Sequence, residues 1–453
     1  MHSFAPSILR EYDIRGPVGD NLGEADAHAL GRSFATRVRR GGGSRVAVGR
    51  DGRLTSPALE AALVEGLTKG GVDVVRIGLG PSPMLYFAEA TLPVDGGIQV
   101  TASHNPKQDN GFKMVLGHRS FWGEDIRGLA AISAAGDWTD GHGALDEVAV
   151  LPAYVARLMQ GYGGGAFRVG WDCGNGAAGP AVEALTAVLP GEHHLLHTTP
   201  DGDFPHHHPD PADAANMADL QALVAREKLD FGVAFDGDGD RIGVVCGRGR
   251  ILYGDQVLAL LAGPLLRELP GATIIADVKA SDALFAQVAA LGGVPRMSKT
   301  GHSAIKSMML AIGAPLAGEM SGHIFFGQDF YGHDDALYAA VRLIRAVHLS
   351  GRSLTEMVDA LPQYVGTPDL RFAVPDARKE AVIAEVIARL EANGADLDRT
   401  DGARVRTADG WWLLRASNTQ GALTVRAEAR NQAALDRLLA EVDAQLAASG
   451  IHR

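Results

Sequence analysis

The stretch SRVAVGRDGRLTSPALEAALVEGLTKGGVDVVRIGL, residues 44–79, contains two apolar runs separated by a segment with helical character. Residues 44–50 and 72–79 are rich in β-branched side chains, which predicts two strands, and residues 56–71 predict a helix between them. Continuous apolar strands joined by a helix are typical of a sheet that is covered on both faces. The stretch therefore predicts a βαβ unit and an α/β fold.

The same alternation of strand and helix recurs in residues 166–189 and 271–293, and residues 229–246 predict a strand, a polar loop and a strand. We therefore expect three consecutive α/β segments of domain size. The chain changes character near residue 366, where short strands with tight turns are flanked by helices. We therefore expect a C-terminal α+β domain with antiparallel strands. The sequence predicts these domains: 1–148, 149–252, 253–365 and 366–453.

Composition restricts the class of partner. The 453 residues are 46% apolar and 21% charged, and the net charge of −12 argues against nucleic acid or an anionic membrane as the partner. Cys173 and Cys246 could pair, but we expect two buried thiols in a reducing compartment. The N-terminus lacks the apolar core of a signal peptide, and no run reaches the roughly 18 to 20 apolar residues of a membrane span. We expect a cytoplasmic protein.

The loop FDGDGDR, residues 235–241, carries Asp236, Asp238 and Asp240 at alternating positions, with glycines between them. Three carboxylates that converge repel one another unless a hard cation neutralises them, and oxygen ligands suit Mg²⁺. The later ligands of an EF-hand are missing from this segment. The alternative is a solvated acidic turn, which the apolar strands on both sides disfavour. The loop therefore predicts a Mg²⁺ site.

The loop TASHNP, residues 101–106, places a serine at the end of an apolar strand. Ser103 and His104 are adjacent, so on an extended segment their side chains point apart, and we do not expect a Ser–His couple. A serine loop together with an acidic metal loop indicates phosphoryl transfer through the serine oxygen. Taken alone, TASHNP could equally be a capped turn.

Two further loops offer polar groups for a ligand. In GEMSGH, residues 318–323, Glu319 and Ser321 face the same way if the loop is extended, an arrangement that can hold the hydroxyls of a sugar. His323 in the same loop could instead be a buried core histidine. In RASNTQG, residues 415–421, a guanidinium, hydroxyls, an amide and backbone N–H groups at a hairpin turn predict a phosphate site, which Arg426 on the returning strand could also reach.

Two further stretches, one acidic and one rich in histidine, are expected to have structural roles. Asp334 and Asp335 are expected at the start of a helix, where acids complement the helix dipole. PDGDFPHHHPDP, residues 200–211, has a composition that can bind metal, but its prolines favour a rigid inter-domain loop.

Five motifs together carry a resemblance that runs essentially end to end. EYDIRG, TASHNP, DGDGDR, GEMSGH and RASNT occur in an order and at spacings similar to those of the α-D-phosphohexomutase superfamily, within it the bacterial phosphomannomutase/phosphoglucomutase group. The resemblance implies three related α/β domains with mixed sheets and a C-terminal α+β domain with an antiparallel sheet, arranged around a central cleft. It also implies a small phosphosugar substrate, no nucleic-acid or membrane partner, and a monomer or weak homodimer.

The resemblance implies a role for individual residues. Ser103 would be the phosphorylated serine, and its phosphate would bind Mg²⁺ together with the three aspartates. Positions that match catalytic residues of the family are Arg15, His104, Lys113, Arg241 and His323, with Lys113 and His323 as the candidates for proton transfer. Positions that match substrate-binding residues are Lys299, His302, Glu319, Ser321, Arg415, Ser417, Asn418 and Thr419.

The implied reaction interconverts hexose 1-phosphate and hexose 6-phosphate. Phosphoserine 103 gives its phosphoryl group to the sugar, the hexose 1,6-bisphosphate turns around, and its other phosphate returns to the serine. The same bisphosphate should reactivate dephosphorylated enzyme. The motif GEMSGH, with Met320, resembles that of the family members that act on mannose and glucose phosphates, so we expect both sugars as substrates. The alternatives are a catalytically silent sugar-phosphate binding protein and a metal-dependent phosphatase.

Overall fold

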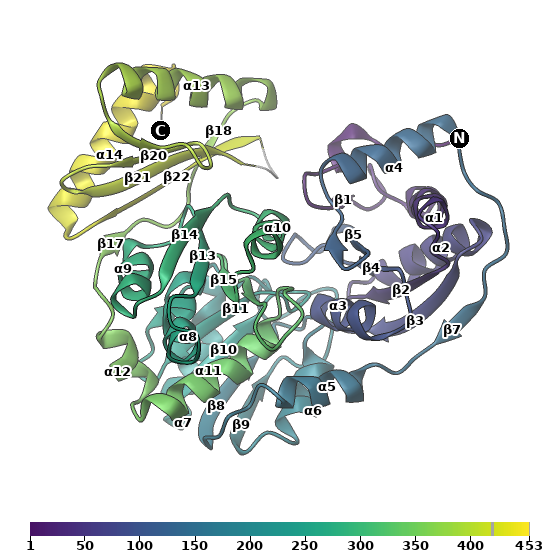
Figure 1. Ribbon diagram of the computed structural model, residues 1–453, viewed down its shortest axis with the longest axis horizontal. Helices are drawn as coiled ribbons and strands as arrows, with labels where there is room; N and C mark the ends of the chain where they lie inside the picture. The colour runs from purple at the N-terminus through teal and green to yellow at the C-terminus, as the bar shows by residue number, and fades with distance from the viewer. Residues whose placement is uncertain (418–420, 453) are drawn as a thin grey trace.

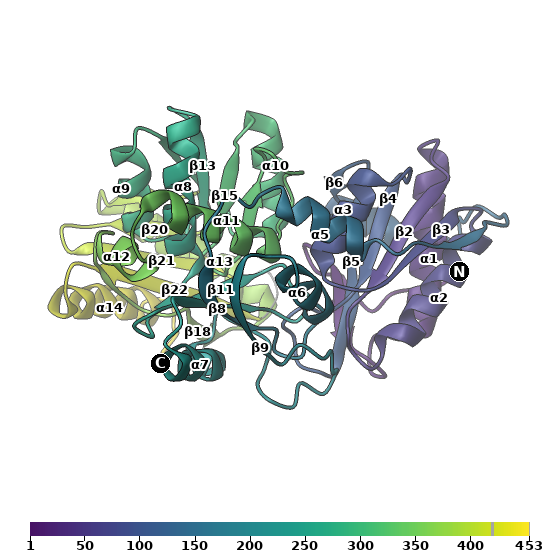
Figure 2. The same ribbon diagram turned by 90° about the horizontal axis from the view of Figure 1, so that it is seen from below.

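The computed structural model describes residues 1–417 and 421–452. Within these residues the chain forms four β-sheets with flanking helices. Figure 1 shows the N-terminal domain in purple and the C-terminal domain in yellow at opposite ends of the molecule, with the teal and green domains between them. In the view from below in Figure 2, the purple N-terminal domain lies on one side and the teal, green and yellow domains lie together on the other. None of the described helices is long and apolar enough to cross a membrane.

The first sheet has the order β1-β5-β4-β2-β3-β7, and β6 pairs with β5. Its strands β2, β3, β4 and β7 are parallel, whereas β1, β5 and β6 run antiparallel to their neighbours. The strands are β1 (Ile14–Pro17), β2 (Arg45–Arg50), β3 (Asp73–Leu79), β4 (Gly96–Val100), β5 (Asp109–Leu116), β6 (Arg119–Ser120) and β7 (Leu145–Glu147). The helices are η1 (Pro6–Ile8), α1 (Glu24–Arg40), α2 (Ser56–Lys69), α3 (Ser82–Thr91) and α4 (Glu124–Ala135).

The βαβ unit predicted from residues 44–79 is confirmed, because β2 and β3 are parallel and α2 connects them. Successive residues of a strand face opposite sides of the sheet. Val46 and Val48 accordingly lie in the core formed with α1 and α2, while Ala47 lies in the core that includes α3. The sheet is therefore covered on both faces.

The second and third sheets are also mixed. Their orders are β12-β11-β10-β8-β9 and β14-β13-β15-β16. The second-sheet region contains α5 (Leu151–Met159), β8 (Phe167–Asp172), α6 (Gly179–Thr186), β9 (Gly191–Leu196), η2 (Ala214–Met217), α7 (Ala218–Glu227), β10 (Phe231–Phe235), β11 (Ile242–Cys246) and β12 (Ile251–Leu252). The third-sheet region contains α8 (Gly254–Glu268), β13 (Thr273–Asp277), α9 (Asp282–Ala290), β14 (Val294–Ser298), α10 (His302–Ile312), β15 (Leu316–Gly318), β16 (Ile324–Phe326), α11 (Ala336–Ser350) and α12 (Leu354–Asp359).

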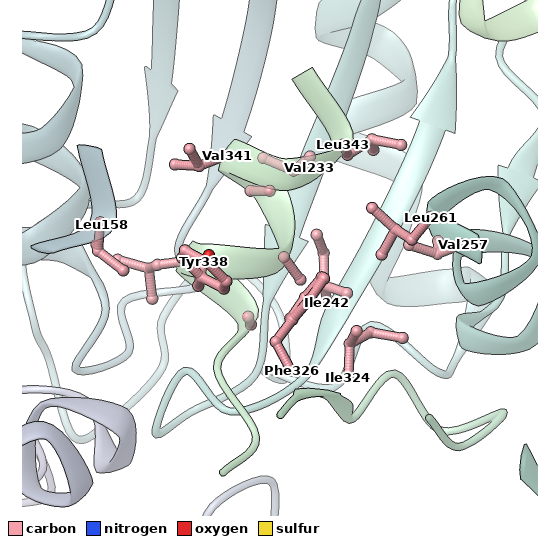
Figure 3. Packing of buried hydrophobic residues seen from close by; sticks show 14 of the residues in the cluster. Leu158, Val233, Ile242, Val257, Leu261, Ile324, Phe326, Tyr338, Val341 and Leu343 are labelled. Carbon is pink, nitrogen blue, oxygen red and sulfur yellow. The ribbon is translucent and has the colours of Figure 1, made fainter. Parts of the chain in front are cut away.

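One apolar core joins these two sheets. In Figure 3, Tyr338 of α11 lies beside Phe326 of β16, and Val233 and Ile242 of the second sheet lie close to the same helix. The rings of Phe326 and Tyr338 meet edge to face, with centroids 5.0 Å apart. Because Phe326 is 1% exposed, truncating it to Ala should cost about 3–5 kcal/mol of folding free energy. The second and third sheets therefore form a continuous support for the loops between them.

The last sheet is antiparallel throughout its described pairs, with the order β17-β22-β21-β20-β19 and with β18 paired to β22. Its elements are β17 (Val365–Gly366), β18 (Leu370–Ala373), α13 (Asp376–Ala392), β19 (Asp396–Asp398), β20 (Ala403–Arg406), β21 (Gly410–Ala416), β22 (Ala422–Ala429) and α14 (Gln432–Ala447). The predicted fold class is thus confirmed: three α/β units with mixed sheets precede an α+β unit with an antiparallel sheet.

Candidate active site

Ser103 lies in the loop that follows β4, and its backbone has φ +52°. This left-handed conformation turns the chain, so the loop is not extended at this residue. Ser103 Oγ lies 3.1 Å from His104 Nδ1, and the Ser103 backbone N–H donates to Thr101 Oγ1 at 2.9 Å. The expectation that the Ser103 and His104 side chains point apart was therefore wrong, because it assumed an extended backbone.

Arg53 holds the serine loop in this shape. Its guanidinium is buried, with the residue 2% exposed, and donates four hydrogen bonds to backbone carbonyl oxygens of the loop. Nη2 donates to Ser103 and Asn105, both at 2.7 Å, and Nη1 donates to Pro106 at 2.7 Å and Asp109 at 2.9 Å. Arg53 was not predicted from the sequence, because nothing in GRDGR indicates which carbonyl groups its side chain reaches.

Arg15 approaches the same loop from β1, which pairs with β5. Its Nη1 donates to the carbonyl oxygen of Ala102 at 3.0 Å and to Asn105 Oδ1 at 2.7 Å. An ion pair with Asp13 fixes the other end of the guanidinium. The predicted neighbourhood of Arg15 and Ser103 is therefore present, with the cation beside the serine loop.

The acidic loop joins β10 to β11 and meets the serine loop directly. A Cβ atom on Gly237 would lie 2.3 Å from the carbonyl oxygen of Ser103, so only glycine permits this approach. Gly239 has φ +72°, a conformation that also favours glycine. The approach lets Ser103 Oγ donate a hydrogen bond of 2.6 Å to Asp236 Oδ2. The glycines between the carboxylates are thus what brings the two loops together.

The three carboxylates form a site suited to a cation. Asp236, Asp238 and Asp240 are fully buried, and one oxygen from each lies within 4.8 Å of the others. Burial and the charges of the other two carboxylates raise the pKa of Asp236 well above its usual range. Among the described residues, Asp238 Oδ1 and Asp240 Oδ1 have no hydrogen-bond partner. Buried acceptor oxygens without donors fit a bound hard cation such as Mg²⁺.

Lys113 neutralises part of this charge from β5. Its ammonium group donates to Asp238 Oδ2 at 2.6 Å and to Asp240 Oδ2 at 2.5 Å. Burial opposes the charge of Lys113, but the two carboxylates outweigh this effect and raise its pKa well above the usual value. Lys113 is therefore a protonated partner of the acidic loop, which is a poor state for accepting a proton.

His323 connects the acidic loop to the loop that contains Glu319. Its Nε2 accepts a hydrogen bond of 3.0 Å from Arg241 Nε, which assigns the proton of the neutral ring to Nδ1. Nδ1 lies 2.9 Å from Asp334 Oδ2 and 3.6 Å from Asp240 Oδ1. His323 is thus placed among charged groups and is not a histidine of an apolar core.

Asp334 has a different role from the one expected. Helix α11 begins at Ala336, and the side chain of Asp335 caps it by accepting from the Tyr338 backbone N–H at 2.8 Å. Asp334 precedes the cap and faces His323, and it also accepts from Lys306 Nζ at 2.9 Å. The expectation that both acids complement the helix dipole was wrong for Asp334, because only the cap residue turns back over the first turn.

Glu319 and Ser321 lie in a tight turn, closed by a hydrogen bond of 3.0 Å from the Gly322 N–H to the Glu319 carbonyl oxygen. The loop is therefore not extended as expected, yet the two side chains still meet, with Ser321 Oγ donating to Glu319 Oε2 at 3.2 Å. The Gly301 N–H donates to Glu319 Oε1. This bond joins the turn to the loop of residues 298–303.

His302 begins α10, and its ring stacks on His323 with centroids 5.5 Å apart. Burial and nearby cations, with Lys306 first among them, lower the pKa of His302 well below its usual value, so it is neutral. Lys299 in the same loop is exposed. The structure thus brings His302 into the group around His323 and leaves Lys299 at the surface.

Asp277 is a second residue of the site that was not predicted from the sequence. It ends β13, and its carboxylate accepts from the Met320 N–H and from Thr300 Oγ1, both at 3.2 Å. Burial, opposed by Lys279 and reinforced by Glu319, raises the pKa of Asp277 to about 6. Asp277 therefore fixes both loops at the carboxyl end of a parallel strand, a position that could have identified it.

The C-terminal domain reaches this region through Arg415 on β21. Arg415 Nε donates to Asp401 Oδ2 at 2.8 Å, and the same oxygen accepts from the Thr300 N–H at 3.1 Å. Arg415 Nη2 is buried without a hydrogen-bond partner among the described residues, so it can donate to a bound anion. Ser417 lies at the end of the same segment, with its carbonyl oxygen bound to Lys379 Nζ at 2.8 Å.

Asn418 and Thr419 lie outside the described residues. Arg426 of β22 shares one face of the sheet with Arg415, and its guanidinium donates to the carbonyl oxygen of Lys279 and contacts Met320. Arg426 therefore packs against the loops of the third domain, where it touches GEMSGH.

A separate cavity of about 920 Å³ lies beside α10, between the first and third domains. Lys306, His333 and Trp122 are among its lining residues. None of the residues that the sequence assigned to the site lines it. The cavity is therefore distinct from the group of residues described above.

The fold and the site together define an α/β protein of four domains in which a buried serine faces a buried acidic loop whose carboxylates fit a metal ion. Family models for phosphoglucomutase/phosphomannomutase match the whole length of this arrangement. They cover α/β/α domain I at residues 6–136, domain II at 153–249, domain III at 253–364 and the C-terminal domain at 370–445.

Individual proteins of this family are similar to the chain over nearly its whole length. The phosphomannomutase/phosphoglucomutase of Pseudomonas aeruginosa is 40% identical over 433 residues, which are 95% of this chain and 94% of that protein. The phosphoglucomutase of Neisseria gonorrhoeae is 40% identical and covers 97% of this chain and 96% of its own. The crystal structure of a phosphoglucomutase/phosphomannomutase family protein from Burkholderia thailandensis superimposes with a TM-score of 0.93 at 41% identity, covering 99% and 98% of the two chains. The chain belongs to the phosphoglucomutase/phosphomannomutase family.

Proposed function

We propose that the protein interconverts hexose 1-phosphate and hexose 6-phosphate, with mannose and glucose as the sugars, through phosphoserine 103 and a hexose 1,6-bisphosphate. The observation that carries the proposal is the hydrogen bond of 2.6 Å between Ser103 Oγ and Asp236, which places a hydroxyl at the edge of a buried acidic site. The names of the relatives, which include both phosphomannomutase and phosphoglucomutase, support the choice of sugars.

The proposed metal is Mg²⁺, held by Asp236, Asp238, Asp240 and an oxygen of the Ser103 phosphate. When bound, it would offset the negative charge of the phosphoryl group during transfer. The metal ligands would already be in position before the ion binds, because Lys113 and the buried carboxylates fix one another's positions. Arg15 supplies a second cation next to the loop that carries the phosphoserine.

In the proposed reaction, a hydroxyl oxygen of the sugar phosphate bonds to phosphorus while the bond from phosphorus to Ser103 Oγ breaks. The hydroxyl proton goes to a base of the protein, and Ser103 Oγ takes up a proton as it becomes a free hydroxyl. In the second transfer Ser103 Oγ gives up this proton and bonds to the other phosphorus, while the bond from that phosphorus to the sugar oxygen breaks and the sugar hydroxyl is restored. We propose His323 for the proton, because its ring bridges Arg241 and Asp334 beside the acidic loop. Lys113 keeps its charge, and His104 contacts the serine oxygen.

We propose that Glu319 and Ser321 hold sugar hydroxyls and that His302 and Lys299 line the same side. Arg415, Ser417, Asn418 and Thr419 would hold the phosphate that is not being transferred. Within the part of the chain that the structure describes, Arg415 Nη2 has no hydrogen-bond partner, which supports this assignment. Arg426 would act indirectly, because its contact with Met320 fixes the loop that carries Glu319.

One fixed donor and one fixed phosphate site serve both ends of the sugar only if the bisphosphate turns around between two transfers. We propose that it turns in a central cleft and that the domain from residue 366 moves to admit it. We also propose that the domains end at residues 148, 252 and 365. The protein would be a monomer or weak homodimer in the cytoplasm.

The experiment is ³¹P NMR of the protein with Mg²⁺, mannose 1-phosphate or glucose 1-phosphate, and a trace of the matching 1,6-bisphosphate. We expect the 1-phosphate resonance to convert to the 6-phosphate without free phosphate, and Ser103→Ala to slow the conversion by orders of magnitude. Accumulation of inorganic phosphate would identify a phosphatase. Binding of the sugar phosphates without conversion would identify a binding protein.

A further inference from the structure

We propose a second metal site, formed by Asp172, His197 and His207, that takes a transition-metal ion such as Zn²⁺. One ligand atom from each of the three side chains lies within 4.8 Å of the others. His207 belongs to the histidine-rich segment of residues 200–211, whereas Asp172 ends β8 and His197 follows β9. The site is separate from the acidic loop and does not depend on the proposed reaction.

Asp172 and His207 are already placed as two ligands of one ion. Asp172 is fully buried, and one of its oxygens accepts from the Gly174 N–H at 3.0 Å. His207 Nε2 lies 3.2 and 3.0 Å from the two carboxylate oxygens. Bonds of about 2.0–2.2 Å to a tetrahedral zinc ion put nitrogen and oxygen ligands roughly 3.3 Å apart. A small movement of either side chain therefore admits the ion.

The second nitrogen of each histidine is bound in the manner of a metal ligand. His207 Nδ1 donates to the carbonyl oxygen of His208 at 3.0 Å, which leaves Nε2 with a lone pair directed at the cluster. His197 Nε2 lies 3.0 Å from Asp219 Oδ2, so Nδ1 is the nitrogen available for the metal. Histidine ligands usually donate their other N–H to a carbonyl or carboxylate, which fixes the ring and raises its basicity.

The ligand types and their exposure select the kind of ion. Two imidazoles and one carboxylate suit Zn²⁺, Co²⁺ or Ni²⁺, whereas the all-oxygen acidic loop suits Mg²⁺. The side chains of His197 and His207 are 13% and 14% exposed, so an ion can enter from solvent and keep water as a fourth ligand. The two sites therefore differ in the metals that they accept.

The segment that carries His207 touches both loops of the active site. His208 Nε2 donates to the carbonyl oxygen of His104 at 2.5 Å, and the Pro209 carbonyl oxygen accepts from the Gly237 N–H at 3.2 Å. An ion on Asp172, His197 and His207 would tie this segment to β8 and β9. The proposed role of the ion is thus to hold the segment against the serine loop and the acidic loop.

The test is binding of Co²⁺ and Zn²⁺ to the metal-stripped full chain in excess Mg²⁺, which keeps the acidic loop occupied. We expect one equivalent of Co²⁺ with the strong d–d absorption of tetrahedral, imidazole-bound cobalt, displaced by Zn²⁺. His197→Asn should abolish this signal, and asparagine tolerates the φ of +51° at that position. Asp219→Asn should weaken binding by about 10–100-fold, because it removes only the carboxylate that orients His197.

His206→Asn is the matched control. His206 stacks on His197 with centroids 3.9 Å apart, and its Nδ1 bonds to Asn175 Oδ1, so it belongs to the segment without joining the cluster. We expect it to bind cobalt as the unchanged protein does, with all variants folded by circular dichroism. Absence of the cobalt signal in the unchanged protein, a signal that survives His197→Asn, or equal loss in His197→Asn and His206→Asn would each overturn the proposal.

Discussion

Replacing Arg53 by Lys should slow the reaction without changing the affinity for substrate. The guanidinium donates four hydrogen bonds to backbone carbonyl oxygens of the loop that presents Ser103. Lysine keeps the positive charge but loses the planar fork, so we expect it to reach two of the four oxygens at most. The loop would then leave two of these carbonyl groups without their donors.

The size of the effect follows from these contacts. Hydrogen bonds from a charged donor contribute about 1.5–3 kcal/mol each, so two lost bonds cost at least about 3 kcal/mol. If that cost falls on the active conformation of the loop, each 1.36 kcal/mol lowers kcat about tenfold, which gives roughly a 100-fold decrease. Since Arg53 is buried behind the loop, KM for the sugar phosphate should change less than about threefold.

The assay is steady-state conversion of glucose 1-phosphate with saturating Mg²⁺ and bisphosphate, together with thermal unfolding of each variant. Arg50→Lys is the matched control, because Arg50 lies three residues away and pairs with Glu60 Oε2 at 3.1 Å without touching the serine loop. It should keep kcat within about twofold. A folded Arg53→Lys variant with unchanged kcat, or one in which KM alone rises, would exclude this role of Arg53 in shaping the serine loop.

Three further predictions address the metal, the phosphate site and pH. Asp238→Asn should raise the Mg²⁺ concentration needed for half-maximal activity at least about tenfold, because it removes a charged ligand and a partner of Lys113; an unchanged Mg²⁺ titration would contradict the assignment. Arg415→Lys should raise KM for hexose phosphates by roughly 10–100-fold through loss of a charged donor, and steady-state kinetics that show only a lower kcat would argue against a binding role. Burial raises the pKa of Asp335 to about 7 against an ordinary value of 3.8, so the folded protein binds this proton more tightly than the unfolded chain does. The bound proton contributes at most about 4 kcal/mol to the free energy of unfolding. This contribution is present below pH 4 and is lost as the pH rises through 7. Urea unfolding across this range should therefore show a shallower loss of stability in Asp335→Asn, which keeps a helix cap, and parallel curves for the two proteins would exclude the shifted pKa.

Much of the architecture follows from local patterns in the chain. The β-branched runs around residues 44–79 predict β2, α2 and β3 because strand and helix periods differ and each run is long enough to show its period. The acidic loop was equally visible, since three aspartates alternate with glycines between two apolar strands. Short motifs on the ends of predicted strands therefore located the serine and the carboxylates.

The parts that sequence could not predict depend on contacts between distant segments. Arg53 acts through backbone carbonyl groups of another loop, and a carbonyl group carries no mark in the sequence. The contact of Ser103 with His104 depends on one left-handed φ angle, which an alternation rule for extended chain cannot supply. Asp334 was assigned to a helix end because neighbouring positions look alike in sequence, whereas the cap geometry separates it from Asp335.

In the proposed reaction, Ser103 carries the phosphoryl group between the two positions of the sugar. The most direct measurement is a chase experiment in which enzyme labelled with ³²P at Ser103 is mixed with unlabelled glucose 1-phosphate and quenched within one turnover. We predict that the label leaves the protein and appears in glucose 1,6-bisphosphate and then in the hexose monophosphates, with Ser103→Ala taking up no label. Label that goes to inorganic phosphate, or that labels Ser103→Ala as well, would contradict the account.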